Sequence, residues 1–183
     1  LEIKNLAKEM KISPVALRKK IETIKEVNPM LGHRGCRLGI TFPDIYRMQV
    51  RAIVEAACRQ VKKGIKVFPE IMVPLVADVN EFKIVRELIV EVAEDAITKA
   101  GVDLNYKIGT MIELPRAAMT ADDIAVEADF FSFGTNDLTQ TAFGLSRDDS
   151  GSFLNEYLDK GLLTRDPFVS LDQQGVGQLI SIA

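Results

Sequence analysis

Residues 107–140, KIGTMIELPRAAMTADDIAVEADFFSFGTNDLTQ, contain two short apolar runs that are each followed by a carboxylate. The first run leads to Glu113 and the second to Asp137, and the residues between them have the composition of a helix. This pattern predicts a strand, a helix and a second strand parallel to the first. Ligands bind at the carboxyl ends of parallel strands, so we expect Glu113 and Asp137 to face the same space.

Apolar runs and helical patterns alternate along the rest of the chain, which predicts an α/β fold. The strand candidates are residues 30–34, 71–75, 108–114 and 130–134. A complete TIM (β/α)8 barrel has eight strands and takes about 250 residues. We therefore expect about four βα units of such a barrel, in one partial domain spanning residues 1–183. Residues 1–28 are expected to be a helical segment that precedes the barrel strands or is inserted among them.

Helix boundaries are predicted from capping residues and apolar stripes. Pro43 is expected to open a helix whose buried stripe includes Met48 and Ile53. Asn80 is expected to cap the longest helix, which should end at Gly101. These assignments place Met48 in the core rather than beside a cofactor.

Composition and charge exclude several classes of function. The chain has 183 residues, 47% of them hydrophobic, and a net charge of -3, which gives no electrostatic reason to expect nucleic acid or an anionic membrane as partner. No apolar run approaches the roughly 20 residues that span a bilayer, and no signal peptide opens the sequence, so we expect a cytoplasmic protein. Cys36 and Cys58 are too few for a disulfide framework, and we expect free thiols.

The first 20 residues hold six Lys or Arg against two Glu. Their apolar spacing predicts two short amphipathic helices, with Ser13 as the cap of the second. A solvated basic face is the usual explanation of such a run, and a DNA-binding helix-turn-helix is the alternative. A non-catalytic interaction module that binds nucleic acid through Arg18, Lys19 and Lys20 also stays open.

The acids of the central stretch suit a hard cation. Carboxylates without His or Cys partners favour Mg²⁺ or Mn²⁺ over zinc. A 2-keto acid could chelate such an ion through its adjacent carboxylate and keto oxygens. Asn136, the backbone N–H groups of residues 134–137 and a nearby arginine would then hold the substrate carboxylate.

Each of these residues also has a purely structural interpretation. Glu113 precedes Leu114 and Pro115 and could serve as a helix cap, and Asn136-Asp137 could shape a turn. Arg34 lies in a glycine-rich turn, where it could bind a carboxylate or phosphate, or equally bond loop carbonyls. The residues alone therefore leave the metal site as one of two interpretations.

Five segments in unbroken order resemble a known family. They are NPMLGHRGCRLG (28–39), IMVPL (71–75), GTMIELPRAA (109–118), FFSFGTNDLTQ (130–140) and SRDD (146–149). Together they resemble the phosphoenolpyruvate/pyruvate-binding barrel of the pyruvate, phosphate dikinase family, along the whole chain. Phosphoenolpyruvate synthases and the phosphotransferase-system enzyme I share the ELP and GTNDL-type motifs, whereas GHRGCRLG points to the dikinases.

The resemblance implies an activity and a set of site residues. The family interconverts ATP, pyruvate and phosphate with AMP, phosphoenolpyruvate and diphosphate. Its Mg²⁺ ligands match Glu113 and Asp137, and its substrate-binding positions match Arg34, Glu113, Gly134, Thr135, Asn136 and Asp137. By resemblance, Arg34, Glu113, Asn136 and Asp137 are the catalytic candidates.

The resemblance also implies parts that this sequence lacks. The family carries its phosphoryl group on a histidine of a separate domain and binds ATP in another, and His33 does not match that histidine. Neither Cys36 nor Cys58 matches the family's C-terminal cysteine, and two further substrate-binding arginines would precede Leu1. We expect this part alone to be inactive and the full-length enzyme to be a homodimer. A phosphoenolpyruvate synthase, or a lyase on the same barrel, is the alternative within the enzymes.

Overall fold

The computed structural model describes residues 2–24 and 31–183, and it divides the chain into two compact units, residues 1–33 and residues 34–183. The site residues of interest, from Arg34 to Asp137, all belong to the second unit.

The first unit contains the two predicted N-terminal helices, α1 (Glu2–Glu9) and α2 (Pro14–Ile24). Ser13 is the predicted cap, because its Oγ accepts a hydrogen bond of 3.0 Å from the Ala16 N–H. Ala7 of α1 and Leu17 of α2 are buried where the helices pack together. Two short helices thus bury one small apolar contact.

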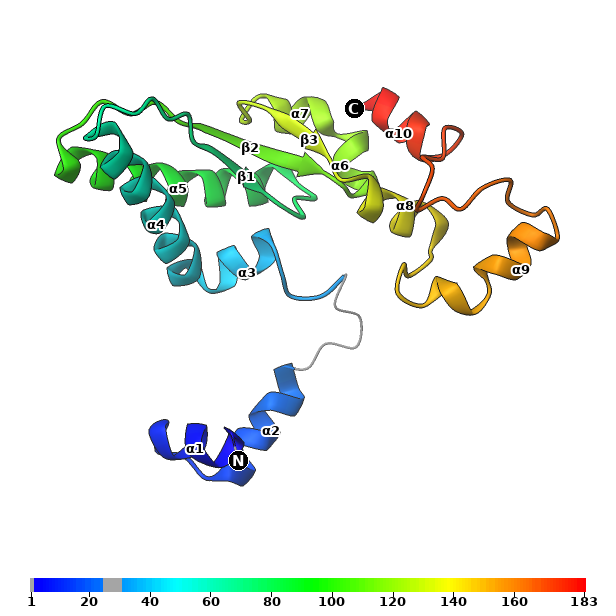
Figure 1. The fold of residues 1–183 in the computed structure, drawn as a ribbon, viewed down its shortest axis with the longest axis horizontal. Coiled ribbons are helices and arrows are strands. Elements are labelled where there is room, and N and C mark those ends of the chain that lie inside the picture. Colours follow the sequence, from blue (N-terminus) through cyan, green and yellow to red (C-terminus); the bar gives the residue numbers. More distant parts are fainter. Residues whose placement is uncertain (1, 25–30) are drawn as a thin grey trace. The chain divides into compact units, whose positions relative to one another are not determined.

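The second unit is built on a parallel sheet whose described strands lie in the order β1-β2-β3 (Figure 1). The strands are β1 (Glu70–Val73), β2 (Lys107–Ile112) and β3 (Phe131–Phe133), close to three of the predicted ranges. The Thr110 hydroxyl adds a side-chain bond of 2.9 Å to the Val73 carbonyl. Three parallel strands therefore end at one edge, as the central stretch predicted.

The predicted strand at residues 30–34 is wrong in its described part. Residues 31–34 form irregular turns, and residue 30 lies outside the described residues. Gly35 takes the left-handed region with φ 58°, so the chain turns here instead of extending. The Cys36 N–H then donates to the Pro74 carbonyl at 3.0 Å, in the loop after β1. The described part of the sheet accordingly has three strands, not four.

Helices connect and flank these strands. They are α3 (Cys36–Thr41), α4 (Pro43–Val61), α5 (Val79–Ala100), α6 (Pro115–Met119), α7 (Ala121–Ala125), α8 (Thr135–Phe143), a 3₁₀ helix (Ser150–Ser152), α9 (Leu154–Asp159) and α10 (Val176–Ile182). Helix α5 joins β1 to β2, and α6 with α7 join β2 to β3. Within the described ranges, no helix has the length and apolar character needed to cross a bilayer.

Helix α4 begins at Pro43 as predicted, but it buries a different face. The residues that pack toward α5 include Val50, Val54 and Cys58, whereas Met48 is 64% exposed and Ile53 is 45% exposed. The prediction that Met48 is a core residue is therefore wrong. Apolar side chains occur on several sides of α4, so their spacing alone did not determine which side α5 covers.

Helix α5 is capped by Asp78 rather than by the predicted Asn80. The Asp78 side chain accepts from the Asn80 N–H at 2.9 Å, and the Glu81 side chain accepts from the Asp78 N–H at 3.1 Å, which forms a capping box. Gly101 ends the helix with φ 63°, as predicted. The capping box fixes the end of the loop that leads from β1.

Val54 and Ile53 are neighbours on α4 that differ in burial and therefore make a matched pair of variants. Val54 is fully buried, and Val54→Ala should lower the free energy of unfolding by about 2 kcal/mol, because it removes buried methyl groups and leaves a cavity. Ile53→Ala should change it by less than about 0.5 kcal/mol. Urea denaturation followed by circular dichroism measures both. Equal losses would contradict the orientation of α4.

Candidate active site

Glu113 and Asp137 meet at the carboxyl edge of the sheet. Glu113 directly follows β2, and Asp137 lies in the first turn of α8, just after β3. The Gly134 N–H donates to the Ile112 carbonyl at 3.0 Å, which ties the start of α8 to the end of β2. The two carboxyl groups are close enough to interact by charge and by a hydrogen bond. The predicted proximity of these two acids is confirmed.

A backbone N–H from the loop after β1 holds Glu113 in place. The Leu75 N–H donates to Glu113 Oε1 at 2.6 Å, inside the protein, where the Glu113 residue is 5% exposed. Leu75 has φ 61°, a backbone conformation that residues other than glycine adopt at an energetic cost. The Cys36 thiol donates to the Leu75 carbonyl at 3.1 Å, so the Leu75 residue is held on both sides. The loop after β1 therefore presents one donor to Glu113.

Burial and Asp137 shift the titration of Glu113. Burial raises the pKa of Glu113 from 4.5 to about 7, and the charge and hydrogen bond of Asp137 act in the same direction. The Leu75 N–H and the positive charge of Arg34 lower the pKa but do not cancel the rise. Near neutral pH the acid pair therefore readily holds either a proton or a cation.

Three of the other predicted site residues are exposed. Arg34 is exposed, yet its charge reaches Glu113. Thr135 and Asn136 are exposed in the first turn of α8, where Gly134 supplies no side-chain cap. The first N–H groups of α8 therefore stay available for an anion, which the helix dipole also favours. The arrangement places anion-binding groups beside the two acids.

Gly134 lets the start of α8 pack closely against Glu113. A Cβ atom at this position would lie 2.5 Å from Glu113 Cβ, 2.8 Å from Glu113 Oε2 and 2.7 Å from Met111 Sδ. Such distances are far below normal contact distances, so a side chain does not fit without displacement of Glu113. Of the two Glu113 oxygens, Oε1 accepts from Leu75 and Oε2 lies against Gly134.

The donor set fits a hard divalent cation. Among the described residues, no cluster of three or more His, Cys, Asp or Glu side chains is placed to hold a metal ion. Glu113 and Asp137 supply two carboxylates, and an ion such as Mg²⁺ commonly completes its shell with water and substrate oxygens. The close approach of the two carboxyl groups and the tendency of the pair to hold a proton agree with such an ion.

Several residues that shape the site were not foreseen. Arg116 pairs with Asp78 at 2.9 Å and donates to the Ala77 carbonyl, so it holds the loop that carries Leu75. Gln140 Nε2 donates to Asp137 Oδ1 at 3.0 Å. The spacing of Asp137 and Gln140 along one helix face was a signal for this contact. The role of Leu75 had no such signal, because its backbone makes the bond.

Cys36 and Cys58 are free thiols, as predicted, and both are buried. Burial raises the pKa of the Cys36 thiol to about 12, so it stays protonated and acts as a hydrogen-bond donor to Leu75. Cys36 therefore contributes to the structure of the loop and does not act as a nucleophile.

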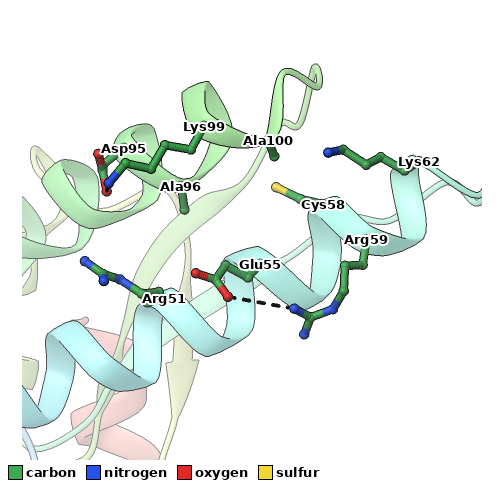
Figure 2. Close-up of a pocket in the computed structure, with 9 residues that line it drawn as sticks. All are labelled: Arg51, Glu55, Cys58, Arg59, Lys62, Asp95, Ala96, Lys99 and Ala100. Atoms are coloured by element: carbon green, nitrogen blue, oxygen red, sulfur yellow. Dashed lines mark hydrogen bonds and ion pairs between the residues drawn. The ribbon is translucent and has the colours of Figure 1, made fainter.

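A separate groove of about 290 Å³ lies between α4 and α5 (Figure 2). Its rim carries exposed charges that largely pair within their own helix, with 3.8 Å between Arg59 and Glu55 and 2.8 Å between Lys99 and Asp95. Cys58 contributes to its wall. Exposed pairs with this spacing are common on helix surfaces and contribute little. The buried acid pair is therefore the stronger candidate site.

The family model described as "PEP-utilising enzyme, PEP-binding domain" matches residues 3–183. The chain belongs to this family. The match covers both units of this PEP-binding domain and includes all of the predicted site residues.

Curated relatives of this PEP-binding domain carry the name that the sequence motifs indicated. The chain is 57% identical over 183 residues to a pyruvate, phosphate dikinase of Rhizobium meliloti (strain 1021), covering 100% of this chain and 20% of the relative. It is 54% identical over 180 residues to that of Clostridium symbiosum, covering 97% and 20%. A chloroplastic form from Mesembryanthemum crystallinum is 60% identical over 164 residues, covering 90% and 17%. The resemblance to the dikinases is confirmed, and the chain spans about a fifth of these relatives' length.

Gly134→Ala tests the close packing of Gly134 against Glu113. We expect it to lower the free energy of unfolding by about 1–3 kcal/mol, because the added methyl overlaps Glu113 and Met111. Gly151→Ala is the matched control, since a Cβ there would meet nothing within 4 Å. Thermal denaturation of both variants measures the difference. An unchanged midpoint for Gly134→Ala would contradict the close approach of Gly134 and Glu113.

The raised pKa of Glu113 predicts a pH-dependent stability without divalent cations. The folded protein binds this proton more tightly than the unfolded chain, so the stabilising contribution is complete below pH 4.5 and is lost as pH rises through about 7. Between pH 5 and pH 8 the free energy of unfolding should fall by on the order of 1–3 kcal/mol from this group. Glu113→Gln should remove this contribution to the pH dependence of the free energy of unfolding.

Urea denaturation in EDTA at both pH values, for the wild type and for Glu113→Gln, gives the two slopes. The exposed Glu87→Gln serves as the control, because Glu87 lies on the surface of α5. Identical slopes for the wild type and Glu113→Gln would show that Glu113 titrates as it does in water.

Proposed function

We propose that this chain is the pyruvate- and phosphoenolpyruvate-binding part of a pyruvate, phosphate dikinase. The observation that carries the proposal is the acid pair Glu113–Asp137, in which each carboxylate has one oxygen bonded by the protein. The family match supports phosphoenolpyruvate as the ligand, and the names of the curated relatives support the dikinase over a phosphoenolpyruvate synthase or lyase.

We propose that the three strands form a sector of a TIM (β/α)8 barrel. Parallel strands that neighbour each other in sequence order are what a barrel requires, whereas doubly wound sheets reverse their strand order. Ile71, Val73, Ile108 and Ile112 join the helices in one core, while Met72 is exposed on the opposite face. In a closed barrel the face bearing Met72 and Met111 would point inward, and Glu113 follows this alternation at the top of β2.

In this proposal the acid pair and the groups around it bind different parts of the substrate complex. Glu113 and Asp137 hold Mg²⁺, and the free N–H groups at the start of α8, with Asn136, bind the substrate carboxylate. Arg34 adds a positive charge on the exposed side. Bound Mg²⁺ would supply a Lewis-acid charge for the oxygen that becomes negative when the methyl group of pyruvate loses a proton.

Catalysis in this proposal needs other parts of the polypeptide. The dikinase reaction converts ATP, pyruvate and phosphate into AMP, phosphoenolpyruvate and diphosphate, with the phosphoryl group carried by a histidine of another domain. The relatives are about five times longer than this chain, which leaves room for those domains. We propose that the full-length protein acts as a homodimer and that this part alone does not turn over.

The basic N-terminal helices leave a non-catalytic alternative that stays a prediction. It expects a salt-dependent gel shift with DNA or RNA that is lost when Arg18, Lys19 and Lys20 are neutralised. The acid pair at the sheet edge has no role in that alternative, which is why we favour the enzyme.

Glu113→Gln tests the proposed site in the full-length protein. Oxalate mimics the planar enolate, and it should bind the wild type only when Mg²⁺ is present. Glu113→Gln should weaken this binding by at least the roughly 10- to 100-fold that outer-shell partners of a metal typically account for, because it removes a direct ligand charge. Isothermal titration calorimetry with and without Mg²⁺ measures the effect.

Glu87→Gln is the charge-matched control, since it removes an exposed carboxylate from α5. It should bind oxalate like the wild type. Wild-type affinity in Glu113→Gln, or oxalate binding that does not need Mg²⁺, would refute the proposed site.

A further inference from the structure

Gln140 uses both ends of its side-chain amide within the protein. It lies one helical turn after Asp137 on α8, and its Nε2 donates to Asp137 Oδ1 at 3.0 Å. Its Oε1 accepts from the backbone N–H of Arg147 at 2.8 Å. Gln140 therefore bridges the acid pair and the loop that follows α8.

The two partners determine which way the amide points. A backbone N–H can only donate, so the Gln140 oxygen must face Arg147. An ionised carboxylate can only accept, so the Gln140 NH₂ group must face Asp137. The two constraints select the same orientation of the amide, which leaves its donor committed to Asp137.

The loop that fixes Gln140 is itself held by bonds that do not involve the Gln140 side chain. Helix α8 ends at Gly144 with φ 64°, where the chain reverses. Ser150 is buried, and its Oγ donates to the Arg147 carbonyl at 3.1 Å. Its N–H donates to the Ser146 carbonyl at 2.9 Å. The Arg147 N–H is thus presented to Gln140 by a folded loop.

The bridge affects how the two acids face each other. Asp137 is half-buried in the first turn of α8, and without partners its carboxylate would sample several rotamers. Gln140 occupies Oδ1 of Asp137 just as Leu75 occupies Oε1 of Glu113. Each of the two carboxylates thus has one oxygen bound by a donor outside the pair.

We propose that Gln140 is a positioning residue that fixes the Asp137 carboxylate for Mg²⁺ binding and that takes its own orientation from the Arg147 backbone. The inference rests on the proposed function, because it assigns Asp137 as a metal ligand. It adds a residue outside the predicted site and connects the SRDD loop (146–149) to the acid pair.

Gln140→Met in the full-length protein tests the proposal, because Met has a similar size but neither hydrogen bond. Oxalate binding is measured by calorimetry over a series of Mg²⁺ concentrations. The Mg²⁺ concentration for half-maximal oxalate binding should rise about 10- to 100-fold, as for other partners that orient metal ligands. At saturating Mg²⁺ the oxalate affinity and the number of sites should return to the wild-type values.

Two further variants separate positioning from a structural role. Gln140→Asn keeps an amide but is one methylene shorter and cannot reach both partners, so it should shift the Mg²⁺ dependence even if Gln140→Met folds poorly. Thr141→Val is the control, because the Thr141 hydroxyl bonds the Asp137 backbone carbonyl at 2.6 Å and not the carboxylate. It should leave the Mg²⁺ dependence unchanged.

The outcomes distinguish this inference from the function on which it rests. Wild-type Mg²⁺ dependence in both Gln140 variants, together with lost binding in Glu113→Gln, would overturn the positioning role alone. Weaker oxalate binding or fewer sites that saturating Mg²⁺ does not restore would show a structural role and also overturn it. Oxalate binding by the wild type without any need for Mg²⁺ would overturn the proposed function.

Discussion

The hydrogen bond from the Leu75 N–H to Glu113 Oε1 links the loop after β1 to the end of β2, and the geometry of the site depends on it. A buried carboxylate is unfavourable unless it is hydrogen-bonded, so Glu113 needs this donor. Leu75 can offer it only with φ 61°, a conformation that the surrounding structure must hold. The segment after Arg34 does so, because Cys36 bonds the carbonyls of both Pro74 and Leu75. The glycine-rich turn thus has two roles: it carries Arg34, and it holds the loop that contains Leu75.

The acid pair lowers the stability of the fold, which is common at functional sites. Two carboxylates at one sheet edge repel each other, and burial makes that repulsion stronger by lowering the local dielectric. A protein selected for stability alone would replace one acid with an amide. The groups around the pair are arranged to orient it: a backbone N–H bonds Glu113, an amide bonds Asp137, and Gly134 allows α8 to pack closely against Glu113. Such an arrangement is typical of sites that bind a cation.

Local patterns predicted elements well where one interaction dominates. The apolar runs before Glu113 and Asp137 form β2 and β3. Strand β2 is largely buried, as such a run predicts, whereas β3 is only partly covered. Gly101 ended α5 and Ser13 capped α2, since these roles depend on backbone geometry at one residue. Predictions failed where they depended on which face of a helix is buried or on which contacts a loop makes. Met48 is exposed because α4 has apolar residues on several sides, and residues 31–34 are irregular because glycine conformation and loop contacts prevail there.

The sequence by itself determined the class of fold, the family and the two acids of the candidate site, because strand periodicity, acid placement and motif order are local properties. It also indicated that Glu113 and Asp137 would meet, since parallel strands end at a common edge. Only the tertiary structure decided what holds them there. The Leu75 N–H and the Cys36 thiol act through contacts between segments that are distant in the chain. Gln140 is close to Asp137 in sequence, but its second bond goes to the backbone N–H of Arg147, and a backbone group carries no residue-specific signal. Their partners are set by how the loops fold back on the sheet edge.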